Sequence, residues 1–258
     1  MAARSRTRVL ILLAAAITAA VVLIQNLPRP EPAPEELFPT GEMRIAVDAS
    51  NPPFAVATAD DLFGLEIDLG EALADHFGLP ARFVNMSFDG LYDSLKADQA
   101  DLVIAMLTID PLRTGDVLYT RHYFDAGLVL VSPLERPIQS MRELAGHRLA
   151  YEFGSNADTL ARRWLRRIHP FETAPYELPS YALDAVRFGH ADAALVDAVS
   201  ARLHLREHQW QAALHYVTNN WYPIAVPIDE VARWQALNRA LQILDDNGTL
   251  DRIITKWL

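Results

Sequence analysis

The sequence predicts an α/β fold built on a largely parallel, doubly wound sheet. From residue 43 onward, short apolar runs typical of strands alternate with segments of helical periodicity. The 258 residues are 51% apolar and 22% charged, a globular composition with room for one or two domains. The net charge of −10 argues against a nucleic-acid partner. The absence of cysteine excludes disulfides, thiolate metal ligands and a cysteine nucleophile.

The first 26 residues predict a signal peptide or an N-terminal membrane anchor. Arg4, Arg6 and Arg8 precede the apolar run 9-VLILLAAAITAAVVLI-24. Because small residues suited to cleavage lie inside this run and not after it, we favour an uncleaved anchor over a cleaved signal. Positive residues before the run place the following domain outside the cytoplasm. Residues 27–42 contain five prolines and predict a semi-extended linker.

The strand and helix expectations follow in chain order. Strands are expected at 43–47, 82–86, 101–106, 127–131, 148–153, 193–196 and 223–227. Helices are expected at 65–78, closed by Gly78, and at 89–97. Further helices are expected from a capping box at Ser155 through 168, from 229 to 246, and at 250–258 after a Thr249 cap.

Polar residues follow several of these strands. Ligands of open parallel sheets bind beyond the carboxyl ends of the strands, where Asp48, Thr108, Ser155 and Asp197 are expected. Each precedes a turn or a helix start, where free N–H groups can hold an anion. Asp48 and Asp197 could equally be plain turn or helix caps.

Arg113 is expected in the first turn of a helix that starts at Asp110-Pro111. A cation there is unfavourable by ~0.3–1 kcal/mol. The arginine has a rationale if its guanidinium, together with the helix N–H groups, binds a carboxylate. With Asp197 as the opposite charge, the pair would bind a zwitterion such as a free amino acid. Alternatively, Arg113 pairs with Asp110 or Asp116 on the surface.

Seven segments in order resemble the bacterial extracellular solute-binding proteins of family 3, the amino-acid receptors of ABC importers. They are 44-RIAVDASNPPFAV-56, 64-GLEIDLGEALADHFGL-79, 99-QADLVIAMLTIDPLR-113, 119-YTRHYFDAGLVLV-131, 146-GHRLAYEFGSNADT-159, 189-GHADAALVDAV-199 and 244-LDDNGTLDRIITKWL-258. The resemblance implies a two-lobe periplasmic-binding-protein-like fold of type II, with a hinged cleft between the lobes. It places lobe 1 at 43–127 plus 223–258 and lobe 2 at 128–222.

The resemblance also implies roles for residues at matching positions. Arg113 matches the carboxylate-binding arginine and Thr108 its hydroxyl partner. Asp197 matches the ammonium-binding aspartate, and Asp48 an acid near the ligand side chain. Ser155 matches a small hydroxyl residue at a lobe-2 helix start. The implied partners are an amino-acid ligand and an ABC permease in the membrane, with the receptor a monomer and with no catalytic residue, metal or cofactor.

The sequence departs from the family pattern at three positions. Asn51 replaces an aromatic residue, so aromatic stacking on the ligand must come from elsewhere or be absent. Met106 stands where many members have Gly and could narrow the pocket, and Glu152 stands where Gln or Lys is more common. The candidate stacking residues are Phe54, Phe88, Trp221 and Tyr222.

The charge balance of the candidate site favours a cationic ligand such as arginine, lysine or ornithine. Asp48, Glu152 and Asp197 outnumber Arg113 if all four line the site. Alternatively, Glu152 points away and pairs with Arg148 or Arg162.

Other functions remain open at this point. The run 204-HLREH-208 matches the H-x-x-E-H metalloprotease pattern, but five-residue patterns recur by chance and an ordinary solvated helix is favoured. A dehydratase acting on prephenate-like or arogenate-like carboxylates could use the same fold, with Arg113 as carboxylate receptor and Glu152 or Asp48 as acid. A tethered sensory or accessory domain is the third class.

Overall fold

The computed structural model describes residues 32–167 and 170–258. The predicted anchor at 1–26 lies outside these residues. Within the described chain, no helix has the length and apolar character needed to cross a membrane. Within the predicted linker, Pro34–Leu37 form the short helix α2, and the side chains of Leu37 and Phe38 are buried in the core.

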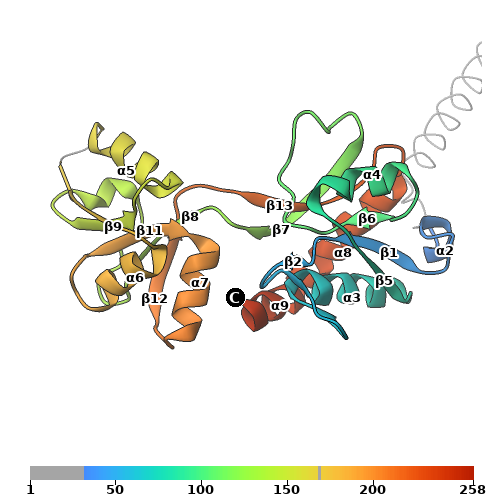
Figure 1. The fold of residues 1–258 in the computed structure, drawn as a ribbon, viewed down its shortest axis with the longest axis horizontal. Coiled ribbons are helices and arrows are strands. Elements are labelled where there is room, and N and C mark those ends of the chain that lie inside the picture. The colour runs from blue at the N-terminus through green and yellow to red at the C-terminus, as the bar shows by residue number, and fades with distance from the viewer. Residues whose placement is uncertain (1–31, 168–169) are drawn as a thin grey trace, which may run out of the picture. The chain divides into compact units, whose positions relative to one another are not determined.

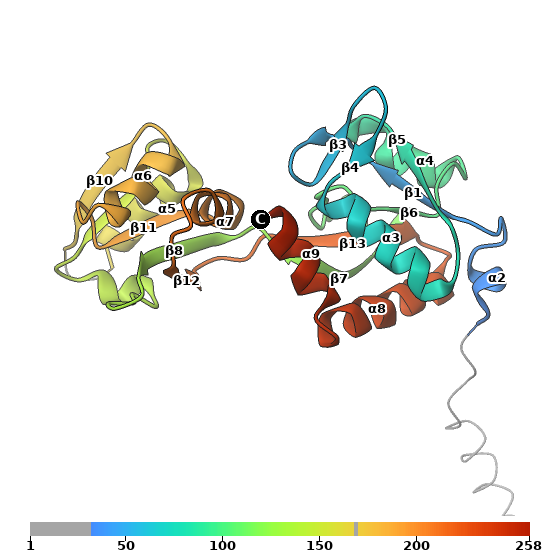
Figure 2. The same cartoon turned by 90° about the horizontal axis from the view of Figure 1, so that it is seen from below.

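The first five-stranded sheet has the order β5-β1-β6-β13-β7 (Figure 1). Its parallel part consists of β5 (Ala81–Asn85), β1 (Met43–Val47) and β6 (Leu102–Val103), whereas β13 (Trp221–Pro227) runs antiparallel to both β6 and β7 (Val117–Asp125). Helices α3 (Leu65–Phe77), α8 (Val231–Asp246) and α9 (Thr249–Trp257) cover one face (Figure 2). The 3-10 turn η1 (Phe88–Gly90) and α4 (Leu91–Lys96) follow β5, and α4 packs on the other face.

The second five-stranded sheet has the order β10-β9-β11-β8-β12. Strands β10 (Glu172–Tyr176), β9 (Arg148–Glu152) and β11 (Ala193–Asp197) are parallel, and β8 (Leu128–Pro133) is antiparallel to both β11 and β12 (Ala212–Tyr216). Helices α6 (Pro179–Arg187) and α7 (Ala198–Glu207) pack on one face, and α5 (Asn156–Leu165) and η2 (Met141–Leu144) pack on the other. A separate small sheet joins β2 (Ser50–Asn51), β3 (Ala55–Ala57) and β4 (Leu62–Phe63).

Both large sheets are mixed but largely parallel in strand direction, as expected. In each sheet four strands run in one direction and one strand, β13 or β8, runs against them in the second position from one edge. Three of these strands, β7, β10 and β12, were not expected from the sequence. The predicted lobe boundaries stay a prediction, although β7 and β13 belong to one sheet and β8 and β12 to the other.

The chain passes between the two sheets twice, at 126–127 and at 217–220, and the two crossings are bonded to each other. Ala126 N–H donates to the carbonyl oxygen of Asn220 at 2.8 Å, and Leu128 N–H donates to Thr218 Oγ1 at 2.9 Å. A Cβ on Gly127 would lie 1.9 Å from the carbonyl oxygen of Thr218. Only glycine therefore allows the crossings to approach so closely.

Candidate ligand-binding site

Asp48 follows β1 and its side chain is nearly buried. Its Oδ1 accepts hydrogen bonds from the backbone N–H of Ser50 at 3.2 Å and from Ser50 Oγ at 2.7 Å. Asp48 therefore has the turn-capping role that is the alternative to ligand binding, and it uses one carboxylate oxygen for it. A ligand contact through the other oxygen stays a prediction.

A buried carboxyl group that the sequence did not reveal lies beside Asp48. Glu66, in the first turn of α3, is 0% exposed. Its Oε1 accepts from Met106 N–H at 2.6 Å and from the Tyr123 hydroxyl at 2.5 Å, while Oε2 has no hydrogen-bond partner among the described residues. Burial raises the pKa of Glu66 to about 7, and the nearby charge of Asp48 adds to this, although the two hydrogen bonds oppose it.

Met106 is held at the end of the first sheet by this carboxyl group. Its φ of 49° lies in the left-handed region, which glycine adopts without a Cβ penalty. The family preference for Gly at this position therefore has a backbone reason as well as a steric one. The Met106 side chain packs against the core and is only partly buried.

Arg113 does not lie in a helix, which corrects the expectation of a helix starting at Asp110-Pro111. Residues 111–116 form successive turns, with Arg113 N–H bonded to the Asp110 carbonyl oxygen and Asp116 N–H to that of Arg113. The helix-dipole argument for this arginine therefore does not apply. Its guanidinium lies over the Tyr92 ring at 5.0 Å. It also lies 3.9 Å from Asp116 Oδ2, and Asp116 bonds more closely to Lys96 Nζ, at 2.9 Å.

Three predicted residues of the second sheet do come together. Glu152 ends β9, Ser155 caps α5 and Asp197 ends β11, so all three lie at carboxyl ends of parallel strands. They share a pocket of about 200 Å³. Its other lining residues carry no formal charge: Leu128, Asn156, Ala157, Pro179, Leu195 and Val196. The pocket therefore presents two carboxylates and no basic side chain.

Two of these side chains also act as helix caps. Asp197 Oδ1 accepts from Ser200 N–H at 2.8 Å at the start of α7. Ser155 Oγ accepts from the N–H groups of Ala157 and Asp158 and donates to the carbonyl oxygen of Glu152 at 2.7 Å. The cap uses one oxygen of Asp197 and leaves the other without a hydrogen bond among those described for this residue.

Glu152 does not form either of the ion pairs considered for it. Arg162 Nε bonds Asp158 at 2.5 Å, and Arg148 Nε lies 4.0 Å from Glu172. Both candidate partners are thus engaged elsewhere. The Glu152 carboxylate lines the pocket and is partly exposed, as a ligand-binding group would be.

The aromatic candidates divide sharply by burial. Phe54 is 3% exposed and contacts the rings of Phe124 and Tyr222 edge-on, so it packs in the core, and its stacking on a ligand stays a prediction. Phe88, at the start of η1, is 46% exposed. Trp221 is about half exposed, stacks on the His122 ring and donates from Nε1 to Asp125.

The ligand contacts predicted for Tyr222 and Thr108 stay predictions. Tyr222 lines a second pocket of about 560 Å³ together with Asp197 and Arg163. Thr108 is exposed after β6. Within the described chain no contact joins Arg113 to Asp48 or to Thr108.

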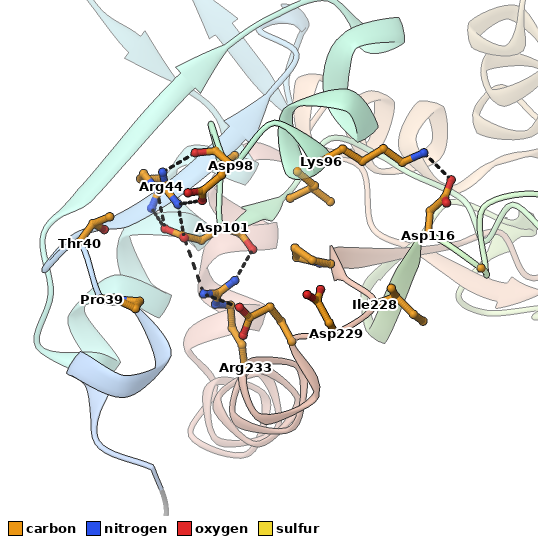
Figure 3. Close-up of a pocket in the computed structure, with 15 residues that line it drawn as sticks. Pro39, Thr40, Arg44, Lys96, Asp98, Asp101, Asp116, Ile228, Asp229 and Arg233 are labelled. Carbon is orange, nitrogen blue, oxygen red and sulfur yellow. Dashed lines mark hydrogen bonds and ion pairs between the residues drawn. The ribbon is translucent and has the colours of Figure 1, made fainter.

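A larger pocket of about 580 Å³ lies at the opposite end of β1 and is a structural ion-pair site (Figure 3). Arg44 donates to Asp101 through its backbone N–H, Nε and Nη2, and to Asp98 through Nη2. Arg233, with its guanidinium over the Phe38 ring, reaches the carbonyl oxygen of Asp101. The charges of Arg44, Asp98, Asp101 and Arg233 therefore already pair with one another.

Comparisons with known proteins agree with this architecture. Residues 43–258 match the model of the bacterial extracellular solute-binding proteins, family 3. The chain is 28% identical over 224 residues to the ABC transporter arginine-binding protein 1 of Escherichia coli, covering 84% of this chain and 90% of that one.

Two solved structures share the fold. A crystal structure of an ancestral cyclohexadienyl dehydratase superposes with a TM-score of 0.74 at 22% identity, over 87% of this chain and 95% of that one. The unliganded open L-cystine solute receptor of Neisseria gonorrhoeae gives a TM-score of 0.71 at 20% identity, over 86% and 94%. At these identities the likeness shows the fold alone, which is the two-lobe type II fold.

Proposed function

Because the chain belongs to the bacterial extracellular solute-binding proteins, family 3, we propose that it is an extracytoplasmic receptor for an amino acid with a cationic side chain. The receptor delivers this ligand to an ABC permease and performs no catalysis. The pocket of Glu152, Ser155 and Asp197 supports the ligand charge, because two carboxylates line it without a basic side chain. The arginine-binding relative supports the same ligand class.

Each charged group has an assigned role in the proposal. The free oxygen of Asp197 accepts from the ligand ammonium group, while its capped oxygen holds the carboxylate in place at the start of α7. Glu152 complements the cationic side chain of the ligand. Arg113 binds the ligand carboxylate; its present contact with Asp116 is long and solvent-exposed and therefore weak, so exchange for a bidentate carboxylate is favourable.

The test is a calorimetric titration of the purified, untagged receptor with arginine, lysine, ornithine, glutamine, cystine and glutamate. We expect arginine, lysine or ornithine to bind and glutamate not to bind. Asp197→Asn keeps an N-cap acceptor but removes the charge, so affinity should fall by roughly 10- to 150-fold. That range corresponds to ~1.5–3 kcal/mol, the net value of a hydrogen bond to a charged group.

Glu152→Gln is the second variant and Glu172→Gln is its matched control, because Glu172 is exposed on β10 and does not line the pocket. We expect Glu152→Gln to lower the affinity for cationic ligands and to change the affinity for neutral ligands little. Tight glutamate binding, or equal affinities for the two variants, would contradict the assigned charge complementarity.

Two further assays, an activity assay and a thermal-shift screen, test the other two functions. Formation of an aromatic product from prephenate or arogenate would replace the receptor proposal with a dehydratase. If the melting temperature is unchanged by every amino acid, polyamine and small carboxylate, a sensory or accessory domain is favoured, since a ligand at 100 times its Kd adds ~2.7 kcal/mol.

We propose further that the receptor is a monomer held at the outer face of the membrane by residues 1–26. The arginine-flanked apolar run at 9–24 supports this placement. Membrane fractionation followed by N-terminal sequencing checks it. Recovery of a soluble chain starting after residue 26 would show a cleaved signal.

A further inference from the structure

A cluster of metal-ligand residue types lies on the second sheet, outside the candidate ligand pocket. His204 and His208 are four residues apart at the end of α7, so they share one face, and their ring centroids are 4.3 Å apart. Helix α6 packs alongside α7 (Figure 1). It contributes Asp184, whose Oδ1 lies 3.3 Å from His204 Nε2. One ligand atom from each of the three residues lies within 4.8 Å of the other two.

Two atoms of this cluster are buried without a hydrogen-bond partner in the described chain. His204 is 5% exposed, and neither its Nε2 nor Asp184 Oδ1 makes a hydrogen bond that satisfies distance and angle. Buried polar atoms without partners are rare, because they lose their hydration without replacement. The two atoms, an imidazole nitrogen and a carboxylate oxygen, are of types that bind transition-metal ions.

We propose that Asp184, His204 and His208 form a binding site for one divalent transition-metal ion, with Zn²⁺ as the best-suited ion. Two imidazoles and one carboxylate favour Zn²⁺, Cu²⁺, Ni²⁺ or Co²⁺ over Mg²⁺ and Ca²⁺, which prefer oxygen ligands. Zn–N and Zn–O bonds of ~2.0–2.2 Å require ligand atoms somewhat closer than 4.8 Å. His208 and Asp184 are partly exposed and can make this adjustment, and water can complete the coordination.

The site binds a metal but does not have the arrangement of a peptidase. Glu207, the acid of the H-x-x-E-H pattern, is exposed and does not belong to the cluster. The third ligand comes instead from α6, twenty residues earlier in the sequence than His204. A bound ion would fasten the end of α7 to α6.

The amino-acid pocket is independent of this cluster. Asp197 caps the start of α7, and seven residues of helix separate it from His204, a rise of roughly 10 Å. Metal binding therefore uses none of the residues assigned to the ligand.

Arg187 provides a sharp test of the geometry. Its Nη1 lies 3.7 Å from Asp184 Oδ1, where its charge competes with a cation for the same oxygen. Replacing this guanidinium with a neutral amide should strengthen metal binding. If Asp184, His204 and Arg187 instead form an ordinary surface cluster, the protein binds no metal, or Arg187→Gln does not change its affinity for the metal.

The experiment uses the untagged receptor, treated with chelator and dialysed, and titrates it with Zn²⁺ and separately with Mg²⁺. We expect one Zn²⁺ per chain and a melting temperature that rises with Zn²⁺ but not with Mg²⁺. His208→Gln and Asp184→Asn should each weaken Zn²⁺ at least roughly tenfold, and Arg187→Gln should tighten it. His190→Gln, on an exposed histidine outside the cluster, is the matched control and should change nothing.

Two results would overturn the proposal: no Zn²⁺-dependent rise in melting temperature, or Zn²⁺ binding that survives both His208→Gln and Asp184→Asn. Neither variant alters the fully buried His204, and circular dichroism checks that they fold. Should Asp184→Asn unfold, the partly exposed His208→Gln carries the decision.

Discussion

Replacing Glu66 with Gln should remove a pH dependence of stability that this buried carboxyl group imposes. In the folded chain its pKa is about 7, against 4.5 for an unperturbed glutamate. Between these two values the folded state keeps a proton that the unfolded state has lost, so the unfolded state binds fewer protons. The free energy of unfolding therefore falls as pH rises from about 4.5 to about 7 and levels off above that.

The magnitude follows from the size of the shift. At 1.36 kcal/mol per pKa unit, a rise from 4.5 to about 7 amounts to about 3 kcal/mol. Glu66→Gln keeps an oxygen acceptor for Met106 N–H and the Tyr123 hydroxyl but does not titrate. The new amide group adds a constant effect on stability, which cancels when two pH values are compared.

The assay is urea unfolding of both proteins from pH 4.5 to 8.5. From pH 4.5 to pH 8.5, we expect the free energy of unfolding of Glu66→Gln to rise by about 3 kcal/mol relative to that of the native chain. Glu172→Gln, at an exposed carboxylate, should follow the native chain throughout. A gain below about 1 kcal/mol would refute the argument that burial keeps Glu66 protonated.

Five further substitutions test the packing of the first sheet and its helices, all measured by urea unfolding. Asp101→Ala should cost ~3–5 kcal/mol because it removes the buried partner of Arg44 and Arg233, whereas Asp98→Ala, at an exposed partner of Arg44, should cost much less; equal costs would contradict this. Gly78→Ala should cost ~1 kcal/mol, because a Cβ at Gly78 meets open space. Gly64→Ala should cost more, because a Cβ at Gly64 would lie 2.2 Å from a carbonyl oxygen. Phe54→Ala should cost ~3–5 kcal/mol as a core truncation, and a small cost would contradict a packing role for this ring.

The local sequence pattern was sufficient to predict a helix where its capping residues and its apolar face all lie within one short segment. Helix α3 ends at Phe77 with Gly78 in the left-handed conformation at φ 68°, as the sequence predicted. The Ser155 cap is also found, although α5 ends at Leu165 and the expected helix to 168 is wrong in length. The start of α9 differs from prediction, since Gly248 and not Thr249 occupies the cap position.

The local sequence pattern failed where a segment takes its structure from contacts with other elements of the fold. Strands β10 and β12 have weak strand composition and form because β9 and β8 offer them backbone partners. The segment after Asp110 has the Asp-Pro start of a helix. It stays a series of turns because no long helical run follows it, and Val117 enters β7 directly.

The sequence by itself determined the family, the alternation of strands and helices, and the strand-end positions of Glu152, Ser155 and Asp197. These depend on short-range periodicity and on side chains at element ends, which adjacent residues reveal. Only the tertiary structure decided that Glu66 is buried beneath Met106. Only the fold brings Asp184 to the histidines of α7, because such contacts join residues that are distant along the chain and depend on how whole elements pack.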